Sequence, residues 1–247
     1  MVNNSRIIVS LDYPDPLQAM ELANKLDPGC CKLKVGKELF TRSGPEFVKK
    51  LVHSGFPVFL DLKFHDIPNT VAAACTAATE LGIWMLNVHA SGGMKMISAA
   101  REAIDKASHK PLLIAVTVLT SLADDDLAVV GVNGSVKQQV LRLARISSDS
   151  GADGVVCSAQ EVAMLRQEIS PSFCLVTPGI RPRGAEANDQ IRIVTPSDAI
   201  ESGSDYLVIG RPITQAREPL QALLSIEQEV NAALLKVRKP AAGTLNP

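Results

Sequence analysis

The sequence predicts a single-domain α/β protein with a (β/α)8 TIM-barrel fold, and three observations support this prediction. The chain has 247 residues, which is a usual length for one such barrel. Hydrophobic residues make up 46% of the chain and aromatic residues only 4%, so the core must consist of aliphatic side chains, as in buried parallel sheets. Short apolar runs also alternate with longer amphipathic segments along the chain.

Eight apolar runs are predicted to be the strands of this barrel. They are rich in Val, Ile and Leu and mostly continuous, which indicates strands that are buried on both faces. In chain order they are Ile7–Leu11, Cys31–Val35, Val58–Leu62, Met85–Val88, Leu112–Leu119, Gly154–Cys157, Cys174–Val176 and Tyr206–Ile209. A doubly wound open sheet is the alternative arrangement of the same elements.

The segments between these runs have the spacing of amphipathic helices. Ile67–Leu81 and Val136–Ser148 are examples, because their apolar residues recur three or four positions apart. Asn69 and Thr70 stand early in the first of them, where helix-capping residues are expected. We find no linker, repeat or low-complexity insert, so residues 1–247 are predicted to form one domain with a flexible tail over about residues 236–247.

Composition limits the function classes. The formal net charge of −1 argues against a surface for nucleic acid or another polyanion. The five cysteines contain no C-x-x-C pair, so reduced thiols in a cytoplasmic protein are expected rather than a zinc or disulfide framework. We see no signal peptide and no apolar run that approaches about 18 residues, so no membrane location is expected.

Polar residues recur at the predicted carboxyl ends of the strands, where barrels of this class place their active sites. They are Asp12, Lys34 with Gly36, Asp61 with Lys63, His89, Thr120 with Ser121, Pro178 with Gly179 and Arg181, and Gly210 with Arg211. The most informative string is D-x-K-x-x-D, formed by Asp61, Lys63 and Asp66. Alternation along a strand puts Asp61 and Lys63 on one face. Buried charges persist only when they are paired or functional, so this string predicts a site.

These strand ends resemble the orotidine 5′-phosphate decarboxylase family. The resemblance extends from about Arg6 to Ala233. It is carried by Ser10–Asp12, Lys32–Gly36, Phe59–Thr70, Thr117–Ser121, Thr177–Arg181 and Ile209–Arg211. It implies a TIM-barrel lyase that converts orotidine 5′-monophosphate to uridine 5′-monophosphate (UMP), the last step of UMP synthesis, without a metal or a cofactor.

The resemblance also implies catalytic roles for four residues. Loss of carbon dioxide from C6 of the pyrimidine leaves a carbanion in the ring plane, which an ammonium group can stabilise and then protonate. Lys63 matches the family's lysine for this role. Asp61 either disfavours the substrate carboxylate or holds Lys63 protonated and oriented. Lys34 and Asp66 extend the pair to an array of alternating charges.

The remaining implied contacts bind the substrate. Asp12, with Lys34 and Thr70, would bind the ribose, whereas Thr120 and Ser121 would contact the pyrimidine. Phosphate would be bound by Gly210 and Arg211 and by a lid over residues 179–190, through Arg181 and Gln190. Pro178 completes the substrate-binding set. Asp66 and Thr70 would reach the partner's site in a homodimer.

Two other functions remain open at this point. Metal-dependent sugar-phosphate decarboxylases or aldolases of the same superfamily share the D-x-K-x-x-D string, but they carry an acidic residue where Lys34 stands. A lysine there repels a cation. A non-catalytic phosphate-ligand-binding barrel would be expected to have a broken charge array. Simpler alternatives for single residues are a structural ion pair for Asp61 and Lys63 and a helix N-cap for Asp12. Asp124–Asp126 is expected only to open a solvated helix.

Overall fold

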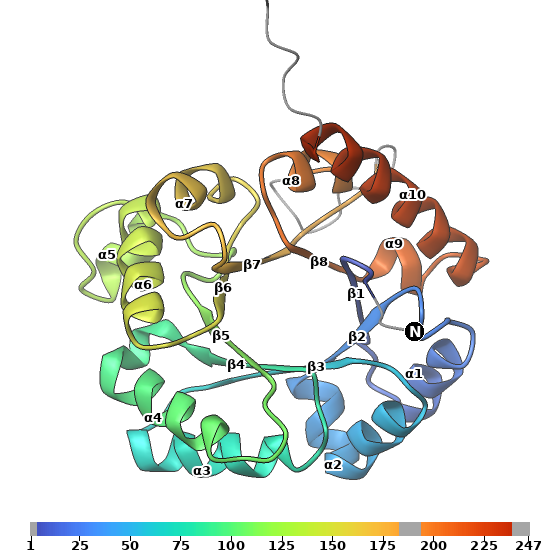
Figure 1. Cartoon of the computed structure of the whole chain (residues 1–247), viewed down its shortest axis with the longest axis horizontal. Coiled ribbons are helices and arrows are strands. Elements are labelled where there is room, and N and C mark those ends of the chain that lie inside the picture. Colours follow the sequence, from blue (N-terminus) through green and yellow to red (C-terminus); the bar gives the residue numbers. More distant parts are fainter. Residues whose placement is uncertain (1–3, 183–193, 239–247) are drawn as a thin grey trace, which may run out of the picture.

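The barrel is closed in a computed structural model of the chain, which describes residues 4–182 and 194–238. The strands are parallel and follow the order β1 to β8 around the barrel (Figure 1). Their bounds are β1 Ile7–Ser10, β2 Lys32–Gly36, β3 Val58–Phe64, β4 Met85–His89, β5 Leu112–Val116, β6 Gly154–Val156, β7 Cys174–Pro178 and β8 Tyr206–Ile209. Because β1 also pairs with β8, the predicted TIM barrel is confirmed and the open sheet is wrong.

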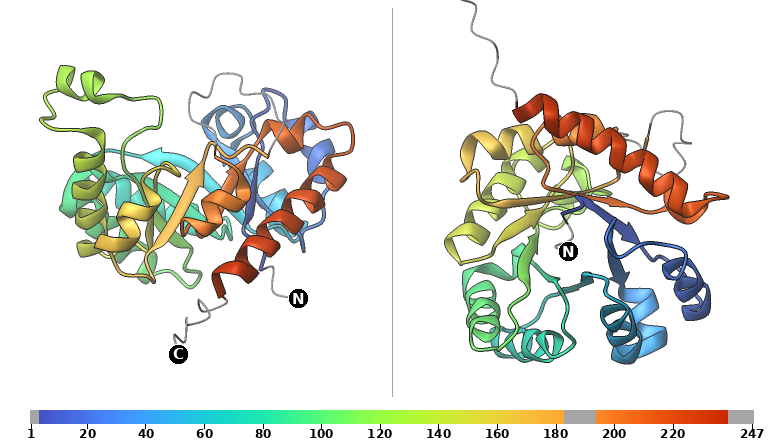
Figure 2. Two further views of the ribbon diagram at one scale, coloured as in Figure 1. Left: turned by 90° about the horizontal axis from the view of Figure 1, so that it is seen from above. Right: turned by 45° about the vertical axis from the view of Figure 1, so that its right-hand side comes forward.

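Helices surround the barrel on its outer side (Figure 1). Their bounds are α1 Pro16–Ala23, α2 Lys37–His53, α3 Pro68–Thr79, α4 Gly93–Asp105, α5 Asp124–Val129, α6 Val136–Asp149, α7 Val162–Glu168, α8 Pro196–Glu201, α9 Arg211–Thr214 and α10 Pro219–Arg238, with a 3-10 turn at Ala90–Gly92. α5 stands away from the barrel wall on the face toward which the strands point (Figure 2). No helix within residues 4–182 and 194–238 has the length and hydrophobicity needed to span a bilayer.

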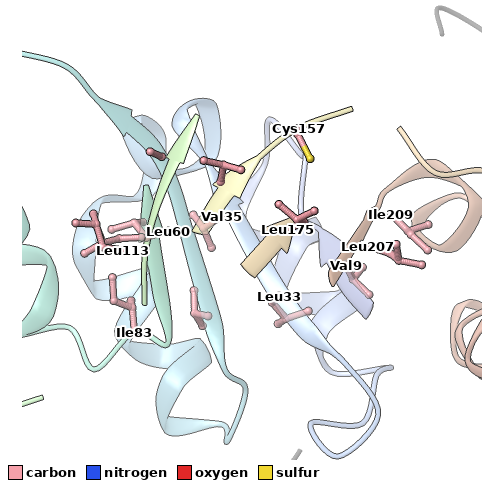
Figure 3. Close-up of a cluster of buried hydrophobic side chains, with 14 of the residues drawn as sticks. Val9, Leu33, Val35, Leu60, Ile83, Leu113, Cys157, Leu175, Leu207 and Ile209 are labelled. Atoms are coloured by element: carbon pink, nitrogen blue, oxygen red, sulfur yellow. The ribbon is translucent and has the colours of Figure 1, made fainter. Parts of the chain in front are cut away.

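Side chains at alternate positions along the strands belong to two different hydrophobic clusters. One set faces the helices and includes Val9, Leu33 and Leu60, which belong to the large buried cluster of Figure 3. The other set forms a smaller cluster that includes Ile8 and Phe59 and lies on the interior face of the barrel. Most strands are thus apolar on both faces, which explains why the sequence shows mostly continuous rather than alternating runs. β2 is an exception, because Lys32 and Lys34 occupy its interior positions.

The strand register determines which polar residues share the interior face. Ser10 pairs with Lys34, Lys34 with Phe59, and Phe59 with Met85, so these residues form one layer. Asp61 lies two residues after Phe59 along β3 and therefore on the same face. The site residues therefore continue the interior positions of the barrel beyond its apolar layers.

Several element boundaries differ from prediction. The predicted strand Leu112–Leu119 ends at Val116. Thr117 makes the last bonds to β6, because its backbone N–H (3.3 Å) and its hydroxyl (2.8 Å) both donate to the Val156 carbonyl. The tail expected to be flexible from about residue 236 is helical as far as Arg238, and residues 239–247 lie outside the described part of the chain.

The predicted helix caps also need correction. The N-cap of α3 is Ile67, which makes no side-chain cap bond, and Asn69 and Thr70 lie inside the first turn. α1 is capped by Asp15, whose carboxylate accepts from the Leu17 N–H at 2.9 Å. Asp12 is therefore not a helix cap. The prediction for Asp124–Asp126 is confirmed, because these residues form the first turn of α5.

Candidate active site

Strand β3 carries the central acid–base pair, and its backbone is irregular there. Lys63 has a φ of +53°, a left-handed conformation that costs a non-glycine residue about 1 kcal/mol. The pairing of β3 with β4 shifts register between Leu60 and Phe64. Lys63 Nζ nevertheless lies 2.6 Å from Asp61 Oδ1. The two side chains meet as predicted, but through an irregular strand rather than through simple alternation.

A chain of alternating charges runs across three strands. Lys34 Nζ lies 3.0 Å from Asp12 Oδ1 and 3.3 Å from Asp61 Oδ2. The Ser10 hydroxyl donates to Asp12 Oδ2 at 2.7 Å. The order is therefore Asp12, Lys34, Asp61, Lys63, and the two carboxylates balance the two ammonium groups. Only 10% of the Lys34 side chain and 12% of the Asp61 side chain are exposed, so this balance is what makes their burial tolerable.

A glycine on β2 gives the Lys34 ammonium its space. A β-carbon at Gly36 would lie 3.2 Å from Lys34 Nζ and 3.5 Å from Asp12 Oδ1. Any side chain there would press on the ion pair from the neighbouring interior position of the same strand.

One polar residue of the site was not predicted from the sequence. Asn87 on β4 is fully buried. Its amide donates to Asp61 Oδ1 at 2.7 Å and accepts from the Lys63 backbone N–H at 2.7 Å. The signal was present, because Asn87 is the lone amide of an apolar run and lies two residues after Met85, on the interior face.

Charge, rather than solvent, keeps Asp61 ionised. Burial is the largest single influence and by itself would raise the pKa of this carboxyl, but the ammonium groups of Lys34 and Lys63, together with hydrogen bonds from Lys63 and Asn87, outweigh it. The net result is a pKa below the usual value for aspartate. Asp61 is therefore an anion at neutral pH.

A cavity of about 200 Å³ opens beside the charge chain. The charged groups Lys34, Asp61 and Lys63 line one part of it. The rest of its wall is Phe59, Val116, Val118, Leu119, Thr120, Val156, Cys157, Pro178 and Val208. Burial raises the pKa of the Cys157 thiol, so this side chain adds no charge to the wall. A flat, mostly apolar ring with a polar substituent at the charged end suits such a lining.

The other predicted substrate contacts differ in whether they line this cavity. Thr120 and Pro178 line it, whereas Ser121 is exposed just beyond Thr120. Arg181 is buried past the end of β7, where its guanidinium donates to the Ile180 carbonyl at 2.9 Å. Gly210 and Arg211 are half-buried at the end of β8. Gln190 and residues 183–193, which include most of the predicted lid, lie outside the described residues.

Asp66 and Thr70 are not part of the charge chain within one subunit. Both side chains are exposed. The Asp66 carboxylate accepts from the Ile67 backbone N–H at 2.6 Å, and Asp66 makes no ion pair within residues 4–182 and 194–238. Asp12, rather than Asp66, supplies the second carboxylate of the chain of charges.

The geometry supports proton transfer and charge stabilisation at one point. An ammonium group at the cavity wall can stabilise an anion and then protonate it, and the adjoining carboxylate pairs with that group and orients it. The other carboxylate and ammonium group extend from the cavity toward its rim, where hydroxyl groups of a ligand can be bound.

Comparisons with known proteins agree with this arrangement. Residues 5–226 match the model of the Orotidine 5'-phosphate decarboxylase / HUMPS family. The chain is 58% identical over 229 residues to the orotidine 5′-phosphate decarboxylase of Hydrogenovibrio crunogenus, covering 93% of this chain and 95% of that one. It is 58% identical over 232 residues to that of Hahella chejuensis, covering 94% and 100%. The crystal structure of orotidine 5′-phosphate decarboxylase from Lactobacillus acidophilus matches with a TM-score of 0.84 and 43% identity over 92% of this chain and 99% of that one.

Proposed function

The chain belongs to the Orotidine 5'-phosphate decarboxylase / HUMPS family, and on that premise we propose that it converts orotidine 5′-monophosphate to UMP and carbon dioxide without a metal or a cofactor. The observation that supports this function most strongly is the balanced chain Asp12–Lys34–Asp61–Lys63 at the wall of an otherwise largely apolar cavity. It presents one ammonium group, that of Lys63, at the end of the chain of charges.

In the proposed reaction, the bond between C6 and the carboxylate breaks and its electron pair remains on C6. The pyrimidine π-system cannot delocalise this pair, so stabilisation must be electrostatic. Lys63 Nζ donates a proton to C6 to form the C6–H bond of UMP, and the amine then takes a proton from solvent. Asp61, 2.6 Å from that nitrogen, pairs with the ammonium group and holds it in place.

The position of Lys34 supports the metal-free reaction over the sugar-phosphate alternative. Its ammonium group bridges Asp12 and Asp61 at 3.0 and 3.3 Å. A divalent cation that used these two carboxylates would have to displace it and would be repelled by its charge. The carboxylates are thus already neutralised by the protein itself.

We assign the substrate contacts by strand end. Asp12 and Lys34 bind the ribose, with Thr70 of the partner subunit. Thr120 and Ser121, after β5, contact the pyrimidine. The phosphate lies over the ends of β7 and β8, where its contacts are Arg181, Gln190, Gly210 and Arg211, beside Pro178. Binding at the remote phosphate orients C6 against Lys63, so that affinity for the phosphate contributes to the rate.

We further propose a homodimer with two shared sites. Asp66 and Thr70 are exposed near Ile67, a residue that is itself 67% exposed. An exposed apolar residue close to two exposed polar ones suits a contact with a second copy of the chain, which would bring the Asp66 carboxylate to the partner's Lys63. The five free thiols fit the cytoplasmic location that the sequence predicts.

The purified protein is expected to consume orotidine 5′-monophosphate and to release UMP and carbon dioxide in equal amounts. The ultraviolet absorbance of the substrate follows the reaction. Addition of a chelator should leave the rate unchanged because no step requires a metal. Absence of turnover would favour a non-catalytic binding barrel. Loss of turnover with the chelator, and its return with a divalent cation, would contradict the metal-free reaction.

Shared sites predict complementation between two inactive variants. A heterodimer of a Lys63→Ala chain and an Asp66→Asn chain has one site with both defects and one site with neither. Purified with two different affinity tags, it should recover about half of the wild-type activity per dimer. A heterodimer of Lys63→Ala and Asp61→Asn chains is the control and should stay inactive, because both residues serve the site of their own chain. No recovery in the first pair would exclude the shared site.

A further inference from the structure

We infer that Asn87 is a positioning residue for the proposed decarboxylation, because its amide fixes both the Lys63 backbone and the Asp61 carboxylate. The inference rests on the proposed function and adds a residue on β4 that touches neither the substrate nor the reacting atoms. Its role is to hold the Lys63 ammonium group where the reaction needs it.

The Asn87 amide makes its first contact where the pairing of β3 and β4 is irregular. Leu60 pairs with Leu86, and the next pair is Phe64 with Val88. Asp61, Leu62 and Lys63 therefore lie opposite the single residue Asn87. The backbone of one residue on β4 cannot make regular ladder hydrogen bonds with three residues on β3. The Lys63 backbone N–H instead donates to the Asn87 side-chain oxygen at 2.7 Å. The amide oxygen thus supports Lys63 at its left-handed φ of +53°.

The second contact of the Asn87 amide is made by its nitrogen. It donates to Asp61 Oδ1 at 2.7 Å, the same oxygen that bonds Lys63 Nζ at 2.6 Å. The other oxygen of this carboxylate faces Lys34. Asp61 is thereby fixed in rotation by three partners. The orientation of the amide follows from chemistry, because a carboxylate can only accept and a backbone N–H can only donate.

These bonds close a ring from the Lys63 backbone through Asn87 and Asp61 to Lys63 Nζ. Asn87 is fully buried, so water does not readily replace either bond. Without the amide, the Lys63 backbone is free to relax toward an extended conformation and the carboxylate is free to rotate. The ammonium group would then shift relative to C6, and a misplacement of about 1 Å costs about 100-fold in rate.

The first test uses Asn87→Leu, which has a similar volume but makes neither bond. Its kcat should fall by about 100-fold, while its affinity for UMP in calorimetry stays within about threefold, because no ligand contact is removed. Ser147→Ala is the matched control. Ser147 is also fully buried, and its hydroxyl donates to the Leu143 carbonyl at 2.7 Å on α6, away from the cavity. It should keep the wild-type kcat.

The second test uses Asn87→Asp and pH. When ionised, the new carboxylate can still accept from the Lys63 N–H, but it repels Asp61. When protonated, it donates to Asp61 and accepts from the N–H, as the amide does. The ratio of variant kcat to wild-type kcat should therefore rise as pH falls. A residue that only fills space would give a ratio independent of pH.

Hydrogen exchange provides a readout that does not depend on activity. The Lys63 amide of the wild-type protein should exchange far more slowly than that of the exposed His65. Wild-type kcat in both Asn87 variants, or an unprotected Lys63 amide, would overturn the inference. If Asn87→Leu does not fold, Asn87→Asp and the exchange measurement decide it. A wild-type protein that does not decarboxylate the nucleotide contradicts the proposed function instead.

Discussion

Lys63→Ala is expected to fold and to bind UMP but to lose decarboxylation by about 10⁴-fold or more, because one group both stabilises the carbanion and protonates it. The fold should survive because Asp61 keeps two partners, Lys34 at 3.3 Å and the Asn87 amide at 2.7 Å. Steady-state rates, calorimetric titration with UMP and circular dichroism check the three parts of this expectation.

A surface lysine provides the control for that variant. Lys49 pairs with Glu46 at 2.8 Å on α2, with 40% of its side chain exposed. Lys49→Ala should change neither rate nor affinity, since exposed pairs contribute little. Near-normal turnover of Lys63→Ala would remove this lysine from the proposed mechanism.

Asp61→Asn should lower kcat by about 10³-fold, because the amide lacks the negative charge that pairs with the Lys63 ammonium group and holds it in place. Ligand affinity distinguishes the two roles open to Asp61. If the carboxylate orients Lys63, the variant should bind orotidine 5′-monophosphate and UMP with about the same ratio of affinities as the wild type. If the carboxylate strains the substrate, the variant should bind orotidine 5′-monophosphate more tightly relative to UMP.

Asp61→Asn should also change the way in which the free energy of unfolding depends on pH. The pKa of Asp61 is held below its usual value in the folded protein, so the ionised carboxylate contributes stability at pH values above about 4, the pKa of aspartate in an unfolded chain. That contribution is lost as the pH falls through the lower, folded pKa. The difference in free energy of unfolding between wild type and Asp61→Asn should therefore shrink below about pH 4. A difference independent of pH would contradict the pKa argument.

The barrel could be predicted from the sequence because each strand corresponds to a local run of apolar residues. All eight apolar runs contain a strand, and the positions after them collect around one end of the barrel. Asp12, Lys34, Asp61 and Lys63 were all predicted to belong to one site, and the structure joins them by ion pairs. The predictions that were wrong concern the exact ends of single elements. The fifth strand ends three residues early, and helix α1 is capped by Asp15 rather than Asp12.

Asn87 shows why part of the site could not be predicted in the same way. Its two bonds are to residues 24 and 26 positions away, so no local pattern records them. The left-handed turn at Lys63 is also invisible in the sequence, because lysine has no preference for that conformation. Both depend on the register between two strands, which is set by packing across the whole barrel.

The sequence by itself determined the number and order of the strands, the end of the barrel that carries the chemistry and the types of charged groups that gather there. These follow from the side-chain pattern and from the rule that parallel strands all point toward one end of the barrel. The tertiary structure decided which charge faces which. It placed Lys34 between two carboxylates and set Asp12 rather than Asp66 in the chain of charges within one subunit. It also brought the Asn87 amide into hydrogen bonds with the Lys63 backbone and the Asp61 carboxylate. The reason is that pairing between side chains on neighbouring strands depends on register and on the irregular backbone of β3, and neither is encoded within a single strand.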